Sequence, residues 1–204
     1  MDKATIRRLV DGAATLGVTL DDAQVRRFDE YLRLLQTWNR KINLTAITAD
    51  AEVVELHFLD SLAAAPLVRE YTTMVDVGCG AGFPGAVLAL VQPALRVTCI
   101  DGVAKKIAFL QTLKRTVVPN LDPRHLRDDA LEQTFDVAVS RATWDPPVWL
   151  DHGRRLVSPG GRLLAMQTGD APVLEAPAGF EREAAVDYTV GGARRRLQPF
   201  RRIA

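Results

Sequence analysis

A glycine-dense segment near residue 80 has the residue types and spacing of a ligand-binding turn. An apolar run, Met74–Val77, leads into Gly78, Gly80 and Gly82, and Pro84 follows at a position suited to the first turn of a helix. Glycines let the chain turn tightly and let a ligand approach backbone N–H groups without interference from a Cβ atom. This pattern of strand, turn and helix predicts a bound cofactor.

The register of the turn separates two classes of cofactor. Gly80-x-Gly82-x-x-Gly85 satisfies the dinucleotide fingerprint, so NAD is a competing interpretation. In a dinucleotide site, however, the first glycine closes the strand. The strand is expected to end at Gly78 here, and from that start Phe83 occupies the position of the third glycine. A purely structural turn without a ligand is the other alternative.

The residue before the turn favours a cofactor with a cationic amino-acid moiety. Asp76 lies two positions before Gly78, where a carboxylate would repel a pyrophosphate. An apolar run followed by Asp-x-Gly-x-Gly-x-Gly resembles motif I of the class I S-adenosylmethionine-dependent methyltransferases. That resemblance implies S-adenosylmethionine as the cofactor and an α/β fold with a Rossmann-like, open and mostly parallel sheet.

Further acids follow the next expected strands. Asp101 ends one of them, at the edge where an acid of a doubly wound sheet accepts hydrogen bonds from ribose hydroxyls. Asp is also a common turn former, but the glycine loop before it favours the ribose role. Asp128 and Asp129 come after the weakest strand candidate, and they form either a solvated acidic pair or a partner for an adenine amino group.

A cation and a histidine complete the candidate site. Arg141 follows another expected strand, where its guanidinium fork can hold a carboxylate or a phosphate with two parallel hydrogen bonds. The alternative is a surface cation, and we favour the site role. His57 and Asp60 are three residues apart and so share one helical face. They either pair structurally or line the cleft for the methyl acceptor.

The elements that position these residues follow from the apolar pattern. Before residue 70 apolar residues recur at helical spacing, with a first helix ending near Gly17, a second beginning at Thr19 or Asp21 and a third capped by Asp50. From Thr73 onward short apolar runs alternate with helical stretches, which is typical of a parallel sheet covered on both faces. The expected strands are Met74–Val77, Val97–Ile100, Phe135–Val139, Leu163–Met166, Phe180–Val186 and Leu197–Ile203, and the expected helices between them include Lys105–Lys114 and Val148–Val157.

The composition is that of an ordinary globular protein. The 204 residues are 48% apolar and 25% charged, which excludes collagen-like and largely disordered classes. The net charge of +1 neither demands nor excludes nucleic acid. This length allows one core with an appendage, and we expect a helical cap over residues 1–68 and a cofactor-binding core over residues 69–204 that form one compact unit.

The cysteines and the hydropathy of the sequence indicate the cellular compartment of the protein. Cys79 and Cys99 have no His partners at metal spacing, so neither a metal site nor a disulfide framework is expected. We expect no secretory signal, and the sequence has no apolar stretch of the roughly 20 residues needed to span a bilayer. We therefore expect a cytoplasmic protein with no membrane partner.

Three other segments sharpen the resemblance. They are Trp38-Asn39-x-x-Ile42-Asn43-Leu44-Thr45-Ala46-Ile47, His57-Phe58-Leu59-Asp60-Ser61-Leu62 and Ser140-Arg141-Ala142. With the glycine loop, and in this order, they resemble the RsmG family, also called glucose-inhibited division protein B, from about residue 20 to 167. The combination is specific, because generic methyltransferases share only the glycine loop and the acid of the second strand.

That resemblance implies methyl transfer from S-adenosylmethionine to N7 of a guanine in 16S ribosomal RNA. The cofactor site predicted from the loop, the acids and the resemblance together comprises Asp76, Gly78, Gly80, Gly82, Phe83, Asp101, Asp128, Asp129 and Arg141. The residues expected to contact the substrate are Asn39, Asn43, His57, Arg194, Arg195 and Arg196.

Two positions depart from the family pattern. Asp128-Asp129 stands where the family usually has Ala-Glu, so the second acid is kept. Gln167-Thr168 stands where it commonly has Lys-Gly, so a lysine that would touch RNA or cofactor is absent. These departures keep open a catalytically inactive RNA-binding module of the same fold, and a methyltransferase for a small molecule or protein is the other alternative.

The expected reaction needs positioning rather than a base. Guanine N7 carries an in-plane lone pair at neutral pH, so no catalytic base is assigned and catalysis should come from alignment. The expected partner is 16S ribosomal RNA or the 30S subunit, with the chain acting as a monomer. RNA binding should leave a basic footprint. The candidate cations are Arg26, Arg27, Arg40 and Lys41 in the cap and Arg194, Arg195, Arg196, Arg201 and Arg202 near the end of the chain, whereas Lys105, Lys106, Lys114 and Arg115 are expected to form an exposed helix face.

Overall fold

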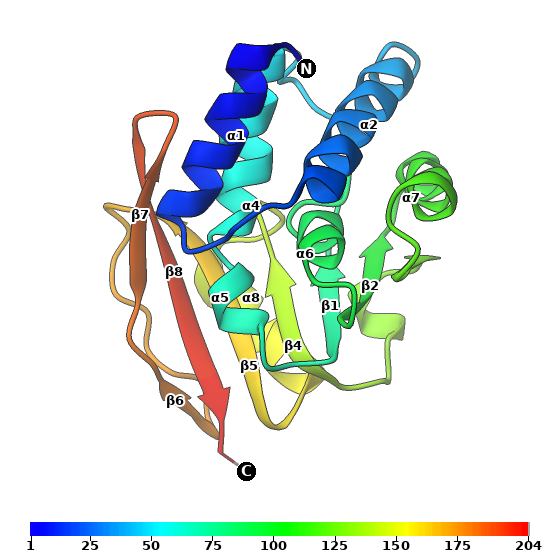
Figure 1. Ribbon diagram of the computed structural model, residues 1–204. Helices are drawn as coiled ribbons and strands as arrows, with labels where there is room; N and C mark the ends of the chain where they lie inside the picture. Colours follow the sequence, from blue (N-terminus) through cyan, green and yellow to red (C-terminus); the bar gives the residue numbers. More distant parts are fainter. Residues whose placement is uncertain (204) are drawn as a thin grey trace.

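The computed structural model describes residues 1–203, in which a run of helices precedes alternating strands and helices (Figure 1). The helices are α1 (Lys3–Thr15), α2 (Asp22–Asn39), α3 (Asp50–Val53), the π-helix η1 (Val54–Leu59), α4 (Asp60–Leu62), α5 (Ala65–Val68), α6 (Gly85–Val91), α7 (Ala104–Thr116), the 3₁₀-helix η2 (Asp128–Ala130), α8 (Pro146–Gly153) and the 3₁₀-helix η3 (Arg154–Leu156). The strands are β1 (Thr73–Val77), β2 (Arg96–Asp101), β3 (Leu121–His125), β4 (Phe135–Ser140), β5 (Val157–Thr168), β6 (Phe180–Arg182), β7 (Val186–Val190) and β8 (Ala193–Arg202).

The strands form one sheet in the order β3-β2-β1-β4-β5-β8-β6, with β7 pairing beside β8. Strands β1 to β5 are parallel, whereas β8 runs antiparallel to β5 and pairs antiparallel with β6 and β7. The strand order reverses between β1 and β4, so the loops after these two strands diverge. A crevice for a ligand forms at the carboxyl edge of such a sheet. The predicted open, mostly parallel α/β sheet is confirmed.

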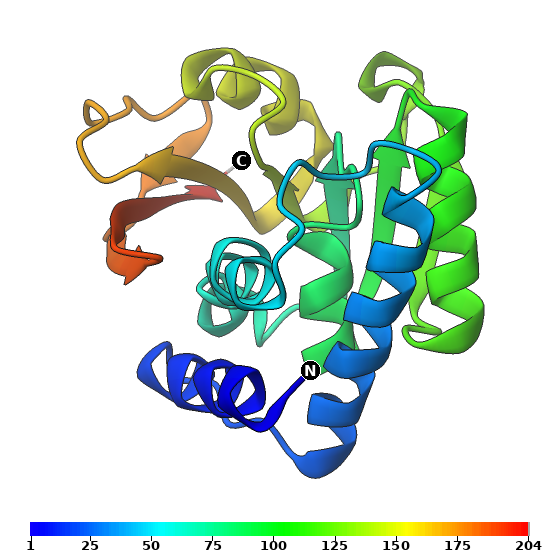
Figure 2. The same ribbon diagram turned by 90° about the horizontal axis from the view of Figure 1, so that it is seen from above.

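The sheet has helices on both faces, and its strand residues alternate between two buried clusters. Met74 of β1 packs with the helices of the N-terminal half, whereas Val75 and Val77 pack with Trp149 of α8. Figure 2 shows α8 on the opposite side of the sheet from α1, α2 and α6. Because both faces are covered, the central strands are apolar on both sides.

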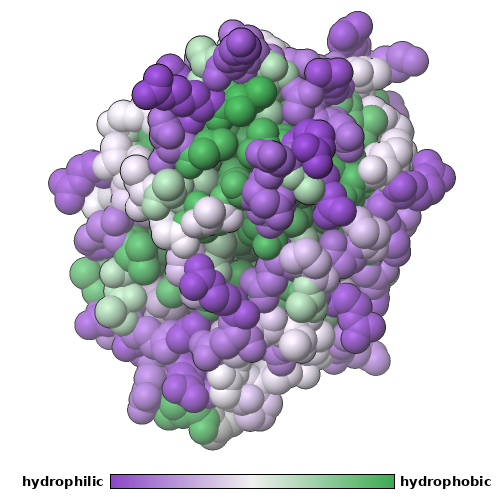
Figure 3. Space-filling model, viewed as in Figure 1, coloured by the Kyte–Doolittle hydropathy of each residue, from purple (hydrophilic) through white to green (hydrophobic). Residues whose placement is uncertain are grey.

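The N-terminal helices share their core with the rest of the chain. Leu9 of α1 and Phe28 of α2 lie in one buried cluster with Leu88 of α6 and Phe109 of α7. The cap expected over residues 1–68 is therefore continuous with the sheet in its packing. On the face seen in Figure 3, hydrophobic residues gather near the top in the region of α1 and α2, with hydrophilic residues around them. No helix in residues 1–203 is long and apolar enough to cross a membrane.

The predicted helix boundaries hold in part. Asp21 caps α2, and its side chain forms a capping box with Gln24. Gly17 follows α1 with a φ of 75°, the left-handed conformation that ends many helices. Asp50, however, is the first residue of α3 and makes no side-chain cap, so its predicted capping role is wrong. The helix beyond it changes to a π-helix over Val54–Leu59, which the 3.6-residue period of an α-helix does not predict.

The predictions after residue 145 need larger corrections. α8 ends at Gly153 and β5 already begins at Val157, so the expected helix Val148–Val157 is too long. The strand expected at Phe180–Val186 is two strands, β6 and β7, and β8 begins at Ala193 rather than at Leu197. Near the start of β8, Arg195 and Arg196 face Asp60 and Asp187 rather than an apolar core, so the hydrophobic pattern does not mark where the strand starts.

Candidate functional site

The loop after β1 contains three glycines with positive φ, namely 70° at Gly78, 57° at Gly80 and 94° at Gly82. A Cβ at Gly78 would lie 2.2 Å from Oγ1 of Thr143, and one at Gly82 would lie 2.7 Å from the hydroxyl of Tyr31. At Gly80, by contrast, a Cβ would meet nothing within 4 Å. The loop is therefore packed at its two ends and open at its centre, where a ligand can approach the backbone.

Asp76, near the end of β1, holds this loop against the start of α6. Its Oδ2 accepts a hydrogen bond of 2.7 Å from the N–H of Gly85, and its side chain is completely buried with Oδ1 unpartnered. Burial raises the pKa of Asp76 to about 7. The residue lines neither of the cavities described below, so the expected direct contact with a cofactor is corrected to a positioning role. Gly82 is corrected in the same way, because it faces Tyr31 and Ala86 in the core.

Asp101 joins the loop to the next helix. Its Oδ2 accepts a hydrogen bond of 3.0 Å from the N–H of Gly80, and its Oδ1 accepts one of 2.8 Å from Val103. Lys106 Nζ lies 3.4 Å from Oδ2. With this hydrogen bond from Lys106, Oδ2 has two donors, so Asp101 keeps the capacity to accept one further hydrogen bond, through Oδ1. It lies at the edge of the sheet that the sequence indicated.

Adjoining cavities of about 450 Å³ and 680 Å³ lie at this carboxyl edge. The smaller one is formed by the ends of β1 and β2, the segment after β3 and the loop after β4, and Asp101 lines it. The larger one is formed by the glycine loop, η1, the loop after β4, the end of β5, and residues of β7 and β8. Gly78, Arg141, Ala142 and Trp144 line both, so a ligand that spans the two cavities would pass these residues.

Arg141 is fixed at the boundary of the cavities by a polar network. Its Nη1 donates to Oδ2 of Asp60 at 2.7 Å and to the carbonyl of Leu56 at 3.0 Å, and its Nη2 lies 3.1 Å from Nδ1 of His57. The other oxygen of Asp60 accepts a 2.9 Å hydrogen bond from the hydroxyl of Tyr188. Asp60 is only 6% exposed, so the charge pair is shielded from water.

His57 lies against Phe83 in the wall of the larger cavity. The two rings stack with centroids 4.4 Å apart, and the guanidinium of Arg141 lies 5.4 Å from the Phe83 centroid. His57 Nε2 is also 2.8 Å from Oγ1 of Thr45. Burial and the adjacent Arg141 lower the pKa of His57 to about 4, so the imidazole is neutral at physiological pH.

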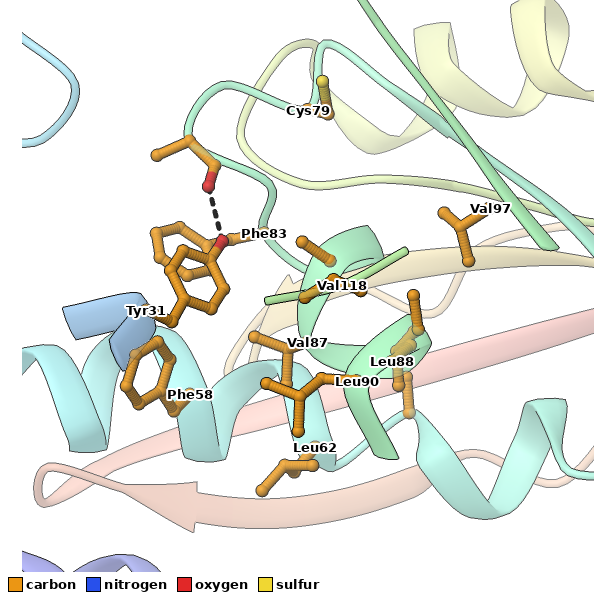
Figure 4. Packing of buried hydrophobic residues seen from close by; sticks show 14 of the residues in the cluster. Tyr31, Phe58, Leu62, Cys79, Phe83, Val87, Leu88, Leu90, Val97 and Val118 are labelled. Carbon is orange, nitrogen blue, oxygen red and sulfur yellow. Dashed lines mark hydrogen bonds between the residues drawn. The ribbon is translucent and has the colours of Figure 1, made fainter. Parts of the chain in front are cut away.

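Tyr31 ties the N-terminal helices to the glycine loop. Its ring stacks on Phe83 with centroids 5.6 Å apart, and its hydroxyl donates a 2.5 Å hydrogen bond to the carbonyl of Ala81. Figure 4 shows this bond beside Phe83 and Phe58. Burial raises the pKa of Tyr31 well above its usual range, so the hydroxyl stays protonated. The sequence places Tyr31 only on an apolar helix face and gives no signal for its hydrogen bond.

The two acids after β3 have different positions. Asp128 lines the smaller cavity, and its Oδ2 is 2.8 Å from Nδ1 of His152. Asp129 is exposed and is absent from the lining of both cavities. Of the two acids predicted as cofactor ligands, Asp128 therefore lies at the cavity, whereas Asp129 in the short helix η2 is exposed to solvent.

The two asparagines predicted to contact substrate differ as well. Asn39 braces the loop that follows α2, because its amide bonds the carbonyl of Thr45 and the N–H groups of Leu44 and Thr45. These hydrogen bonds give it a structural role, and it also lines a pocket of about 430 Å³. Asn43 is exposed at a pocket of about 230 Å³. Three lysines share that pocket, namely Lys41, Lys105 and Lys106.

The arginines at the start of β8 do not form one patch, because strand residues alternate between faces. Arg195 points to the larger cavity, with its Nε 3.9 Å from Oδ1 of Asp60. Arg196 points the other way and makes hydrogen bonds of 2.8 and 3.1 Å to Asp187. Arg194 is exposed. The predicted triplet thus contributes one residue to the cavity.

Gln167 stands in the larger cavity where the family resemblance leads one to expect a lysine. Its Nε2 donates a 3.2 Å hydrogen bond to the carbonyl of Pro172, and its Oε1 is buried without a partner. The cavity therefore keeps a polar group at this position and lacks a charge there. Tyr188 and Trp144 also line it, and the sequence reading missed both.

The fold is that of the class I S-adenosylmethionine-dependent methyltransferases. Magnesium protoporphyrin IX methyltransferase from Synechocystis PCC 6803, solved with bound SAM, aligns with a TM-score of 0.60 at 14% identity and covers 90% of this chain and 98% of its own. TrmN from Thermus thermophilus aligns with a TM-score of 0.56 at 15% identity, over 74% of this chain and 53% of its own. At these identities the likeness is one of fold.

The particular family follows from sequence. The family model described as rRNA small subunit methyltransferase G (GidB) matches residues 24–190. Ribosomal RNA small subunit methyltransferase G of Anaeromyxobacter dehalogenans strain 2CP-C is 44% identical, over 81% of this chain and 80% of the relative, and that of Myxococcus xanthus strain DK1622 is 42% identical over the same shares. The chain belongs to the rRNA small subunit methyltransferase G family, and the resemblance drawn from its motifs is confirmed.

Proposed function

We propose that this protein transfers a methyl group from S-adenosylmethionine to N7 of a guanine in 16S ribosomal RNA. Family membership supports the substrate class. The observation that carries the proposal is the pair of adjoining cavities, which meet at Gly78 and Arg141 on the carboxyl edge of the sheet. The smaller cavity has the acid that suits a nucleoside, and the larger has the volume of a typical small-ligand site.

The residues of the smaller cavity fit the nucleoside half of this cofactor. Asp101 has a free lone pair on Oδ1 for a ribose hydroxyl, and the open space at Gly80 leaves the backbone accessible. Asp128 lies in the same wall as a hydrogen-bond acceptor for an adenine amino group. Arg141 stands between the cavities, where a carboxylate can meet its guanidinium. When bound, S-adenosylmethionine supplies an electrophilic methyl group on a sulfonium.

The chain's own contribution to the reaction is positioning. Guanine N7 needs no deprotonation, so a residue that removes a proton is unnecessary. The walls of the larger cavity would instead hold the base with N7 in line with the bond that breaks, an arrangement that lowers the barrier through orientation. His57 suits this role, because it is neutral and held by Thr45, Arg141 and the face of Phe83.

A guanine within RNA must leave its stack to enter this cavity. The surface beside the cavities favours RNA, since Lys41, Lys105 and Lys106 converge on one pocket and Lys106 also lines the smaller cavity. The prediction that Lys105 and Lys106 form only a solvated helix face thus gives way to a proposed phosphate contact. Arg195 supplies a further cation at the larger cavity.

We further propose that the protein acts as a monomer in the cytoplasm, where its substrate is made. The cap of residues 1–68 and the core of residues 69–204 would act as one unit, since the described parts of both share a buried cluster. Ala204 lies outside the described residues.

The decisive experiment is transfer of labelled methyl from S-adenosylmethionine to 30S subunits that lack the modification, followed by chemical identification of the labelled base. Subunits that already carry the modification are the matched control and should accept no label. Label in 7-methylguanine is the expected result. Cofactor binding without label would favour a different acceptor, RNA binding without label would favour an inactive module, and failure to bind the cofactor would overturn the proposal.

A further inference from the structure

Trp144 is a residue at the cofactor edge to which neither the family resemblance nor the relatives give a role. It lies in the loop between β4 and α8, is half-buried, and lines both cavities. Among the described residues that line the smaller cavity, it provides the only aromatic ring. A flat purine that enters this cavity has no other aromatic surface to contact there.

The indole is held in place by two rings of α8. Trp144 stacks on Trp149 with centroids 5.9 Å apart and an interplanar angle of 10°, and on His152 at 5.3 Å and 25°. Both partners are anchored in turn, because Trp149 Nε1 donates a 2.8 Å hydrogen bond to the carbonyl of Leu164 and His152 Nδ1 lies 2.8 Å from Asp128. A ring held in this way loses little conformational freedom when a ligand binds.

The lining of the smaller cavity also includes an aliphatic side chain. Leu126, in the segment after β3, and Trp144, in the loop after β4, both pack on the buried cluster around α8 and both line the smaller cavity. Asp101 lines it from the end of β2, where it suits a ribose. A purine attached to that ribose would lie in the part of the cavity that has apolar walls, and it would bury one of its faces there.

We propose that Trp144 forms the aromatic wall of the adenine site and thereby sets the affinity of this chain for adenine-containing cofactors. This inference rests on the proposed function, since it takes the smaller cavity as the nucleoside site. The ring does no chemistry. It contributes apolar contact and stacking to the nucleoside half of the ligand, and through His152 it keeps Asp128 in the same wall.

The first test is a fluorescence titration of the full chain with S-adenosylhomocysteine. The chain has three tryptophans, so Trp144→Phe and the matched control Trp38→Phe each remove one of them. Trp38 contacts Phe109 and lies outside both cavities. We expect the ligand to change the emission of the wild-type protein and of Trp38→Phe, and the change to be largely lost in Trp144→Phe. An undiminished change in Trp144→Phe would overturn the proposal.

The second test measures affinity by calorimetry. Trp144→Ala should weaken S-adenosylhomocysteine binding about tenfold, the typical size of a lost base–aromatic contact, whereas Trp144→Phe should stay within about threefold of wild type. The loss should be equal for 5′-methylthioadenosine, which lacks the amino-acid half. A loss confined to S-adenosylhomocysteine, or no loss with either ligand, would contradict the adenine assignment.

Two controls distinguish a failure of this inference from misfolded variants and from a failure of the proposed function. Thermal unfolding identifies variants that are merely destabilised, and Trp144→Leu tests an apolar side chain without an aromatic ring; it should bind between Trp144→Phe and Trp144→Ala. Equal binding by all three variants would overturn the proposal that Trp144 forms an aromatic wall of the adenine site. Wild-type protein that binds neither ligand would instead refute the proposed function, because the inference about Trp144 concerns only how the ligand is held.

Discussion

At the scale of single residues, the site is built from polar groups kept in one protonation state. His57 is neutral, Tyr31 keeps its proton, and Arg141 is matched by the buried carboxylate of Asp60. Each group also has hydrogen-bond partners that fix its direction. A neutral His57 and a protonated Tyr31 suit a reaction that moves a methyl group and requires no proton transfer before it.

A pH–rate profile tests this reading of His57. Because its pKa is held near 4 by burial and by Arg141, the imidazole does not titrate at neutral pH, and we expect kcat for methyl transfer to vary little between about pH 6 and 9. The profile is best measured in an Asp76→Asn background, since Asp76 is a second group with a pKa of about 7. A steep limb near pH 6.5 that disappears in His57→Gln would make His57 a base and contradict the mechanism.

Asp76 itself predicts an unusual dependence of stability on pH. Its pKa rises from 3.8 to about 7 on folding, so the folded state binds the proton more tightly. This stabilisation is complete below pH 3.8 and is lost as pH rises through 7. Asp76→Asn should therefore gain stability relative to wild type between pH 4 and 8, by up to about 4 kcal/mol from the three-unit shift. Denaturant unfolding at several pH values measures the difference.

Asp136→Asn is the matched control with the opposite sign. Partial burial would raise the pKa of Asp136, but hydrogen bonds from Thr72 and Thr73 outweigh it and lower that pKa. The charged form stabilises the fold, so this variant should lose stability relative to wild type as pH rises through the acidic range. If the stability difference from wild type varied with pH in the same direction for both variants, the assignment of Asp76 as a buried carboxyl with a raised pKa would be wrong.

At the scale of elements, the glycine loop depends on a helix that comes fifty residues earlier in the chain. Tyr31 of α2 donates to Ala81 of the loop, and Phe83 of the loop stacks between Tyr31 and His57 of η1. Two elements, α2 and η1, thus meet on one loop. The N-terminal helices therefore have a function beyond covering the sheet, because they support Ala81 and Phe83 in the wall of the larger cavity.

Removal of one hydroxyl tests this coupling. Tyr31→Phe keeps the ring contacts and leaves the buried carbonyl of Ala81 without a partner, which should lower the free energy of unfolding by about 1–3 kcal/mol and weaken S-adenosylhomocysteine binding. Tyr71→Phe is the matched control, because that hydroxyl makes only a 3.4 Å bond to Gly160 at the surface. Equal effects of the two substitutions would show that the α2 bond does not support the loop.

The elements also show what sequence patterns can and cannot predict. The apolar runs located the central strands, and the rule for parallel sheets located Asp101 at their carboxyl edge. Sequence patterns do not predict where the side chain of Asp76 points. Both faces of β1 are covered, so the alternation of side chains along the strand does not show whether a residue faces the core or a cavity. Tyr188 and Arg195 come from a strand pair held partly by ion pairs, which has no hydrophobic period to reveal it.

At the scale of the whole molecule, attraction of RNA has to come from local clusters of positive charge, because the net charge is small. With a formal charge of +1 the protein as a whole offers little attraction to RNA, so the phosphate backbone must meet a local patch. The pocket of Lys41, Lys105 and Lys106 is such a patch, and it joins the cap to the start of α7 beside the smaller cavity. The long-range field that steers association would then act at the place where the base must enter.

The salt dependence of RNA binding measures how many phosphates this patch meets. Binding to 16S RNA should weaken steeply as salt rises, and Lys41→Gln or Lys105→Gln should each lower the slope of log K against log salt by about one. Lys114→Gln, in the last turn of α7, is the matched control and should leave the slope unchanged. A slope that Lys114→Gln lowers as much as Lys105→Gln would mean that RNA senses the general charge of α7 and does not use the pocket. Because the pocket adjoins the smaller cavity through Lys106, a positive result would also fix the side from which RNA approaches the site.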